Sequence, residues 1–223
     1  MINLILILLE AIICYAVLML IFKKYEKEGI YLYAIIATVV SSIMCLKHIS
    51  IMEINVPLGL GVTTSLIIGG NILTQKYGKE AIKNYLIMIF ISSLIANSFL
   101  NMSSMLINSK YALVSNEAYN VIYNYNIGLE VALLVSLIVS TLVSSEIYYL
   151  LKRIQNKIII SNMFSIIIVE FIENIIYVFI AYLLEFSTIE IALCIVFRYI
   201  IKVLIGMAGT IPIMVVSKFS DKE

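Results

Sequence analysis

Four charged side chains lie in the middle of the last two apolar segments of the chain. Glu170 and Glu173 are halfway along one segment, and Arg198 and Lys202 are halfway along the next. Spacings of three and four residues place the members of each pair on one face of a helix. Ionisable residues at the middle of a membrane helix are costly and commonly functional. Two acids opposite two bases therefore predict mutual ion pairing or a shared polar cavity.

This charge quartet permits two hypotheses, which the sequence leaves open. In the first, the charges line a polar binding cavity. In the second, they form a structural ion-pair lock between two helices. The other candidate substrate-binding residues are polar or aromatic side chains: Asn71, Gln75, Asn162, Ser165, Tyr177 and Tyr199.

The composition places these residues inside a membrane protein. Of the 223 residues, 62% are hydrophobic and 13% are charged, whereas soluble domains have roughly 45–50% apolar and about 25% charged residues. The mean hydropathy is +1.07. The formal net charge of +1 gives no indication of a nucleic-acid partner.

Motifs typical of enzymes are missing from the sequence. There is one histidine, His48, and the three cysteines all lie in apolar runs, so we expect neither a metal site nor a disulfide framework. No Walker loop, HExxH or GxSxG pattern occurs. We therefore expect no enzyme activity, no catalytic residues and no cofactor.

Seven apolar runs are long enough for membrane-spanning helices, which need about 20 residues each. They cover residues 2–22, 30–46, 57–73, 81–100, 127–151, 158–184 and 189–216, with a polar loop at 101–126. Basic residues concentrate in every second connector, for example Lys23, Lys24 and Lys27, then Lys152, Arg153 and Lys157. The basic side faces the cytoplasm. We predict an all-α integral membrane protein, a single polytopic domain over residues 1–223, with seven transmembrane helices, the N-terminus outside and the C-terminus inside.

Small residues mark two of these runs. The third run contains Gly59, Gly61, Gly69 and Gly70. Glycines permit a broken helix that lines a cavity, as in many transporters, or close packing against a neighbouring helix. We interpret a second stripe of small residues as a helix-packing seam: Ser136, Ser140 and Ser144.

Several short motifs resemble one membrane-protein family. They are 27–31 (KEGIY), 71–75 (NILTQ) followed by Tyr77-Gly78-Lys79, Asn162-x-x-Ser165, and Tyr199-x-x-Lys202. Together they resemble the queuosine precursor transporter family, also called the VUT or YhhQ family, in its longer form with an additional N-terminal helix. The resemblance covers nearly the whole chain, and its most specific part is Tyr77-Gly78-Lys79.

The resemblance implies uptake of 7-deazaguanine bases, the precursors of the tRNA nucleoside queuosine. The chain departs from the family at several membrane positions. Asn71 and Gln75 stand where the family usually has Asp and Glu, Glu173 stands for an Asp, and Glu170 stands for a Gln. These differences identify a divergent member, in which the substrate or the coupling has changed.

We therefore predict a multi-pass transporter of the cell membrane that imports a queuosine precursor or related purine-like base through a polar cavity. Its expected partners are the lipid bilayer and a small nucleobase-like substrate, with a homo-oligomer or an energising partner subunit left open. Two alternatives remain. One is a non-transporting membrane scaffold with an ion-pair lock, and the other is the substrate-binding subunit of an ATP-driven importer for another small nutrient.

Overall fold

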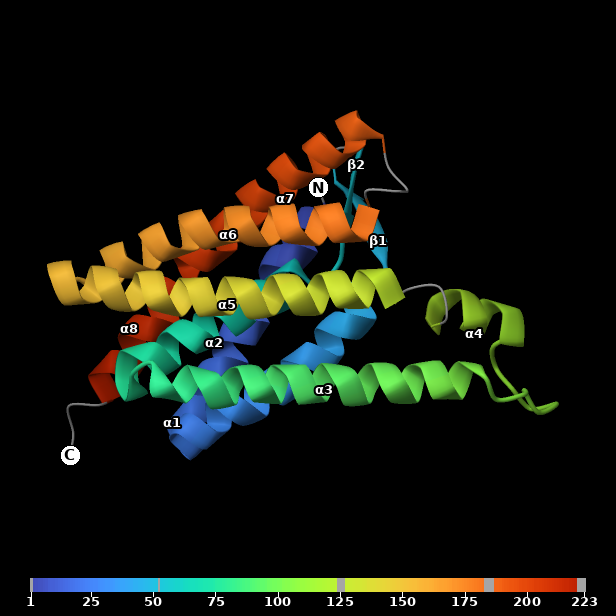
Figure 1. The fold of residues 1–223 in the computed structure, drawn as a ribbon, viewed down its shortest axis with the longest axis horizontal. Helices are drawn as coiled ribbons and strands as arrows, with labels where there is room; N and C mark the ends of the chain where they lie inside the picture. The colour runs from blue at the N-terminus through green and yellow to red at the C-terminus, as the bar shows by residue number, and fades with distance from the viewer. Residues whose placement is uncertain (1, 52, 124–126, 183–186, 220–223) are drawn as a thin grey trace.

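The computed structural model describes residues 2–51, 53–123, 127–182 and 187–219. The chain folds into an elongated helical bundle with one small β-hairpin (Figure 1). The elements in chain order are α1 (Ile2–Met44), β1 (His48–Ile51), β2 (Ile54–Pro57), α2 (Leu60–Tyr77), α3 (Glu80–Ser104), α4 (Asn116–Tyr123), α5 (Ile127–Gln155), α6 (Ile158–Tyr182), α7 (Thr188–Ala208) and α8 (Thr210–Phe219).

Five helices in the described residues are long and apolar enough to cross a membrane. They are α1, α3, α5, α6 and the continuous stretch Thr188–Phe219, which contains α7 and α8. Many of their large apolar side chains are exposed on the outside of the bundle, as expected for helices surrounded by lipid. The predicted class, a helical membrane protein, is therefore confirmed. The count of seven spans and their orientation remain predictions.

α1 contains both of the first two predicted segments, because the chain reverses direction within it. Glu26 has a non-helical conformation with φ 48° and ψ −124°. Asn3, near the start, donates a hydrogen bond to the carbonyl oxygen of Ser50, at 2.8 Å. A straight helix of this length would separate its ends by roughly 60 Å. α1 is therefore a pair of antiparallel arms joined at Glu26.

The connector that follows α1 is a β-hairpin, which the sequence did not predict. β1 and β2 pair antiparallel, with His48 opposite Pro57. The predicted start of the third helix at Pro57 is therefore wrong. Pro57 ends a strand, and Gly59, with φ 91°, turns the chain into α2. This left-handed conformation is readily adopted by glycine.

α2 is a continuous helix in the core of the bundle. Every residue from Leu60 to Thr74 is buried. A Cβ on Gly69 would lie 2.6 Å from the hydroxyl of Tyr85, and that hydroxyl donates to the carbonyl oxygen of Leu66 at 2.7 Å. The structure therefore favours close packing over the broken-helix hypothesis for these glycines.

The remaining helices start and end within a few residues of their predicted bounds. The differences are a short helix inside the predicted polar loop and a division of the last predicted helix. The polar loop at 101–126 contains the short helix α4, and its residues 124–126 lie outside the described part of the chain. Residues 183 and 184, the predicted end of the sixth helix, also lie outside it. The predicted helix 189–216 is divided at Gly209 into α7 and α8.

Most of the basic connectors meet at one end of the bundle, which we call the basic end. There the hydroxyl of Tyr77 donates to Glu26 at the bend of α1, at 3.4 Å. One pocket joins the turn at Gly78 to the end of α5, and another joins the start of α6 to the end of α8. The hairpin and α4 lie at the opposite end, to the right in Figure 1.

Candidate functional site

The four predicted charges meet in the core of the bundle. Nζ of Lys202 lies 2.8 Å from a carboxylate oxygen of Glu170 and 2.8 Å from one of Glu173. Nη2 of Arg198 lies 3.3 Å from Oε1 of Glu173. The helical spacing turns the acids of α6 toward the bases of α7. The predicted ion pairing is therefore present.

The quartet is closed to solvent in this conformation. At most 1% of each of the four side chains is exposed. Its formal charges cancel, so no net charge is placed in the core. An unpaired charge at the middle of a membrane helix costs roughly 2.5–3.5 kcal/mol on insertion scales, and the pairing avoids most of that cost. The four charges thus fasten α6 to α7.

The two candidate tyrosines differ in position. The guanidinium of Arg198 lies 4.0 Å from the ring centroid of Tyr177, so one face of that ring is already covered. Tyr199 lies outside the quartet. Its hydroxyl donates to the carbonyl oxygen of Ile167 at 3.1 Å, and its ring packs edge-on against Phe171, which is half exposed. One step along α7 rotates a side chain by about 100°, which points Tyr199 away from the acids.

Three predicted polar residues meet in a second cluster nearer the basic end. Nδ2 of Asn71 donates to Oδ1 of Asn162 at 3.1 Å. The Ser144 hydroxyl donates to Oδ1 of Asn71 at 2.9 Å and lies 2.8 Å from the Ser165 hydroxyl. Asn162 also donates to the Thr210 hydroxyl at 2.9 Å. We call these five residues the amide cluster; it connects α2, α5, α6 and α8.

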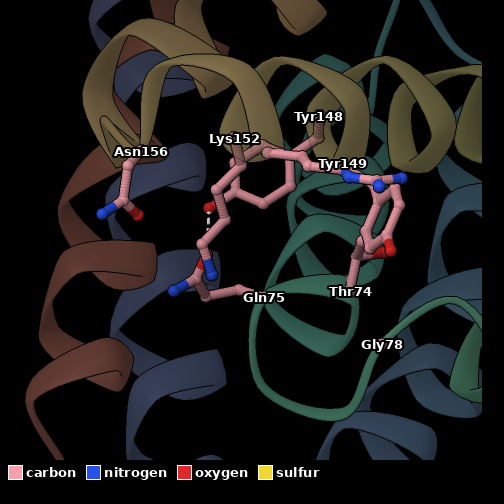
Figure 2. A pocket seen from close by; sticks show the side chains of 8 residues that line it. Thr74, Gln75, Gly78, Tyr148, Tyr149, Lys152 and Asn156 are labelled. Carbon is pink, nitrogen blue, oxygen red and sulfur yellow. Dashed lines mark hydrogen bonds between the residues drawn. The ribbon is translucent and has the colours of Figure 1, made fainter.

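Gln75 lies one turn beyond the amide cluster, in a pocket that opens at the basic end. Its side-chain oxygen accepts a hydrogen bond from the Tyr148 hydroxyl at 2.6 Å. Figure 2 shows Tyr148 and Lys152 reaching from α5 toward Gln75 on α2. The pocket has a volume of about 450 Å³, within the usual range of roughly 300–1,000 Å³ for small-molecule sites.

Tyrosine and histidine side chains cover the quartet on the hairpin side. Nε2 of His48, on β1, lies 2.6 Å from the hydroxyl of Tyr182. That hydroxyl lies 3.4 Å from the hydroxyl of Tyr177. The hairpin is thereby attached to the end of α6 above the ion pairs.

These groups occupy successive turns of the same helices, so polar side chains extend through much of the bundle. Asn71 and Gln75 are one turn apart on α2, as are Ser144 and Tyr148 on α5. We call the whole set the polar column: Tyr177, Arg198, Glu173, Lys202, Glu170, the amide cluster, Gln75 and Tyr148. Of the ten predicted site residues, Tyr199 alone lies outside it.

Sequence reasoning missed Ser144, Thr210 and Tyr148. Ser144 belongs to the serine stripe that we interpreted as a packing seam. Ser136 and Ser140 do bond the carbonyl oxygens of their own helix, at 3.1 and 3.0 Å. Ser144 instead bonds across to α2 and α6. The only sequence signal for this difference is its position one turn from Tyr148.

A bundle of long apolar helices with apolar side chains on its outside defines a multi-pass membrane protein. Residues 57–216 match the family model described as "Putative vitamin uptake transporter". The match covers more than half of the chain, so the chain belongs to this family, and the predicted relationship is confirmed. No curated protein and no solved structure matches the chain.

Proposed function

We propose that this chain imports a queuosine precursor, 7-deazaguanine or a related purine-like base, through the polar column. The observation that carries the proposal is the column itself. Three groups of polar side chains follow one another along the bundle: the quartet, the amide cluster and the pair of Gln75 with Tyr148. Polar groups inside a membrane bundle are expensive and mark substrate or ion pathways.

The proposal assigns roles along the column. Glu173 accepts the paired N–H donors of the base, since a carboxylate has about four lone-pair sites and can bind such donors in a bidentate arrangement. Asn71, Asn162 and Gln75 offer neutral donors and acceptors on the way to the basic end. Neutral amides at Asn71 and Gln75 suit a ligand that carries no net charge.

The orientation belongs to the same proposal. The basic end faces the cytoplasm, the two arms of α1 and the helix α2 complete seven spans, and the hairpin side faces outward. The chain then releases its ligand through the pocket lined by Gln75. The transporter works alone, as a homo-oligomer or with an energising subunit.

A scaffold function is the second candidate, and the closed quartet favours it. Side chains that are at most 1% exposed have the form of an ion-pair lock. The two candidates differ in what happens when Glu173 loses its charge but the fold is retained. Transport then fails if Glu173 holds the ligand and continues if it only fastens α6 to α7.

Complementation tests the proposal in cells. A host that cannot make queuosine precursors is supplied with a low external concentration of 7-deazaguanine-type base, and queuosine is measured in its tRNA. Expression of the chain should restore queuosine, and Glu173→Gln should not. Tyr199→Phe is the matched control, because that hydroxyl lies outside the column. Membrane expression without restoration would refute the ligand assignment.

A further inference from the structure

Arg198 has hydrogen-bonding capacity that the ion pairs do not use. A guanidinium carries five N–H donors, and only Nη2 contacts Glu173. Within the part of the chain that the structure describes, Nε and Nη1 have no hydrogen-bond partner, although the side chain is 1% exposed. Buried donors without an acceptor are costly. This edge of Arg198 therefore lacks a partner.

Arg198 lines a small cavity under the hairpin. The cavity has a volume of about 10 Å³ and is lined by Arg198, Tyr177, Leu133, Cys45, Thr63 and the turn at 57–60. A volume of this size is about that of one water molecule. The residues that line the cavity must therefore move apart before anything larger reaches the guanidinium.

Glu173, the acid beside Arg198, restricts the chemistry of the acceptor that could bind the unpaired donors of Arg198. Arg198 lies immediately beside Glu173, whose carboxylate oxygens are paired with Arg198 and Lys202 in this conformation. A ligand that contacts both needs an acceptor next to its donors. The quartet is already neutral, so an anionic acceptor would add a net charge to the core, whereas a carbonyl oxygen would not. The matching chemistry is a neutral ring lactam, with C=O beside N–H.

We propose that Arg198 is a specificity-determining residue that donates to the ring carbonyl oxygen of the substrate while Glu173 accepts the adjacent N–H donors. The inference rests on the proposed function, because it names the ligand atoms at the same site. The Arg198 contact adds a requirement on the ligand that the Glu173 contact alone does not impose. The ligand must have a strong acceptor at the ring carbon next to the lactam nitrogen.

Two analogues separate the two contacts. In 6-thio-7-deazaguanine, sulfur replaces the carbonyl oxygen and both donors are kept. In 7-deazahypoxanthine, the carbonyl oxygen and the lactam N–H are kept and the amino donor is lost. Binding to the purified full-length chain is measured by competition with radiolabelled 7-deazaguanine. The wild-type chain should bind each analogue about tenfold more weakly than 7-deazaguanine or worse.

Two variants then assign each contact to its residue. Arg198→Lys keeps the charge beside Glu173 but loses the planar donors, so the preference for oxygen over sulfur should fall toward one. Its preference for the amino group should stay. In Glu173→Gln, the preference for the amino group should fall toward one, and the preference for oxygen over sulfur should stay. Equal affinity of the wild-type chain for the oxygen and sulfur compounds would overturn the inference even if neither variant folds. An unchanged oxygen preference in folded Arg198→Lys would also overturn it.

Different results would refute the proposed function and the Arg198 contact. Binding with the expected discrimination but without uptake by cells would refute import and leave the Arg198 contact standing. Uptake without discrimination would refute the contact and leave import standing. If the folded chain binds none of the three bases, both the import proposal and the Arg198 contact are refuted.

Discussion

The Lys202 ammonium lies 2.8 Å from Oε2 of Glu173, in the core of a bundle that carries large apolar side chains on its outside. The same ammonium lies 2.8 Å from Glu170. Glu173 has a second cation, Arg198, at 3.3 Å, whereas Lys202 is the one cation paired with Glu170 among the described residues. The two acids therefore depend on Lys202 to different degrees.

We expect Lys202→Met to leave Glu170 as an unpaired buried charge and to lower the free energy of unfolding by about 3–5 kcal/mol. The double variant Glu170→Gln with Lys202→Met removes one charge of each sign and keeps the pair of Glu173 with Arg198. It should recover most of the loss, as measured by thermal unfolding of the purified chain. A double variant as unstable as Lys202→Met would show that packing, and not charge, causes the loss.

The amide cluster gives a second prediction. Asn162→Leu removes the acceptor of Asn71 and the donor to Thr210, so buried polar atoms lose their partners. The expected loss of stability is about 1–3 kcal/mol for a donor left unsatisfied. Ser161→Ala is the neighbouring control, because Ser161 bonds the carbonyl oxygen of Lys157 in its own helix. Comparable losses in the two variants would contradict the role of the cluster.

Close packing of α2 against α1 gives a third prediction. A Cβ on Gly61 would lie 2.9 Å from the backbone nitrogen of Ala11, and backbone cannot rotate away. Gly61→Ala should therefore destabilise the fold by about 1–3 kcal/mol. Gly128→Ala meets nothing within 4 Å and should leave stability unchanged or raise it slightly, since Ala favours helix. A well-tolerated Gly61→Ala would mean that α2 and α1 lie further apart.

The proposed orientation gives a fourth prediction, which labelling can test. In a chain whose three cysteines are replaced by alanine, Asn156→Cys places a thiol in the pocket at the basic end. Lys110→Cys places one in the loop at the other end. A membrane-impermeant thiol reagent should label Lys110→Cys in intact cells and Asn156→Cys only in inside-out vesicles. The opposite pattern would reverse the orientation.

Much of the site was predictable because charge in a membrane helix obeys strict rules. The spacing of the charged residues placed Glu170 and Glu173 on one face of a helix, with Arg198 and Lys202 on one face of the next, which predicted ion pairing or a shared polar cavity. The prediction fails where side-chain direction depends on helix rotation. Tyr199 shares a turn with Arg198 but points to Phe171, and the sequence contains no rule that separates the two.

The hairpin and the glycines illustrate a second limit. Residues 47–56 were interpreted as a connector, because short strands have no long apolar repeat. Gly69 and Gly70 are compatible with a kink or with close contact, and the positions of Tyr85 beside Gly69 and Thr141 beside Gly70 show close contact. Such contacts between distant segments are set by tertiary packing, which local sequence patterns do not encode.

The central claim is that the polar column carries a guanine-like base, and counterflow in proteoliposomes tests it most directly. Vesicles that contain only the purified chain are loaded with unlabelled 7-deazaguanine and placed in a trace of the labelled base. Exchange of this kind needs no energy source. We predict transient accumulation of label, lost in Glu173→Gln and kept in Tyr199→Phe. Folded wild-type chain that shows no accumulation, or Glu173→Gln that exchanges as fast as wild type, would contradict the claim.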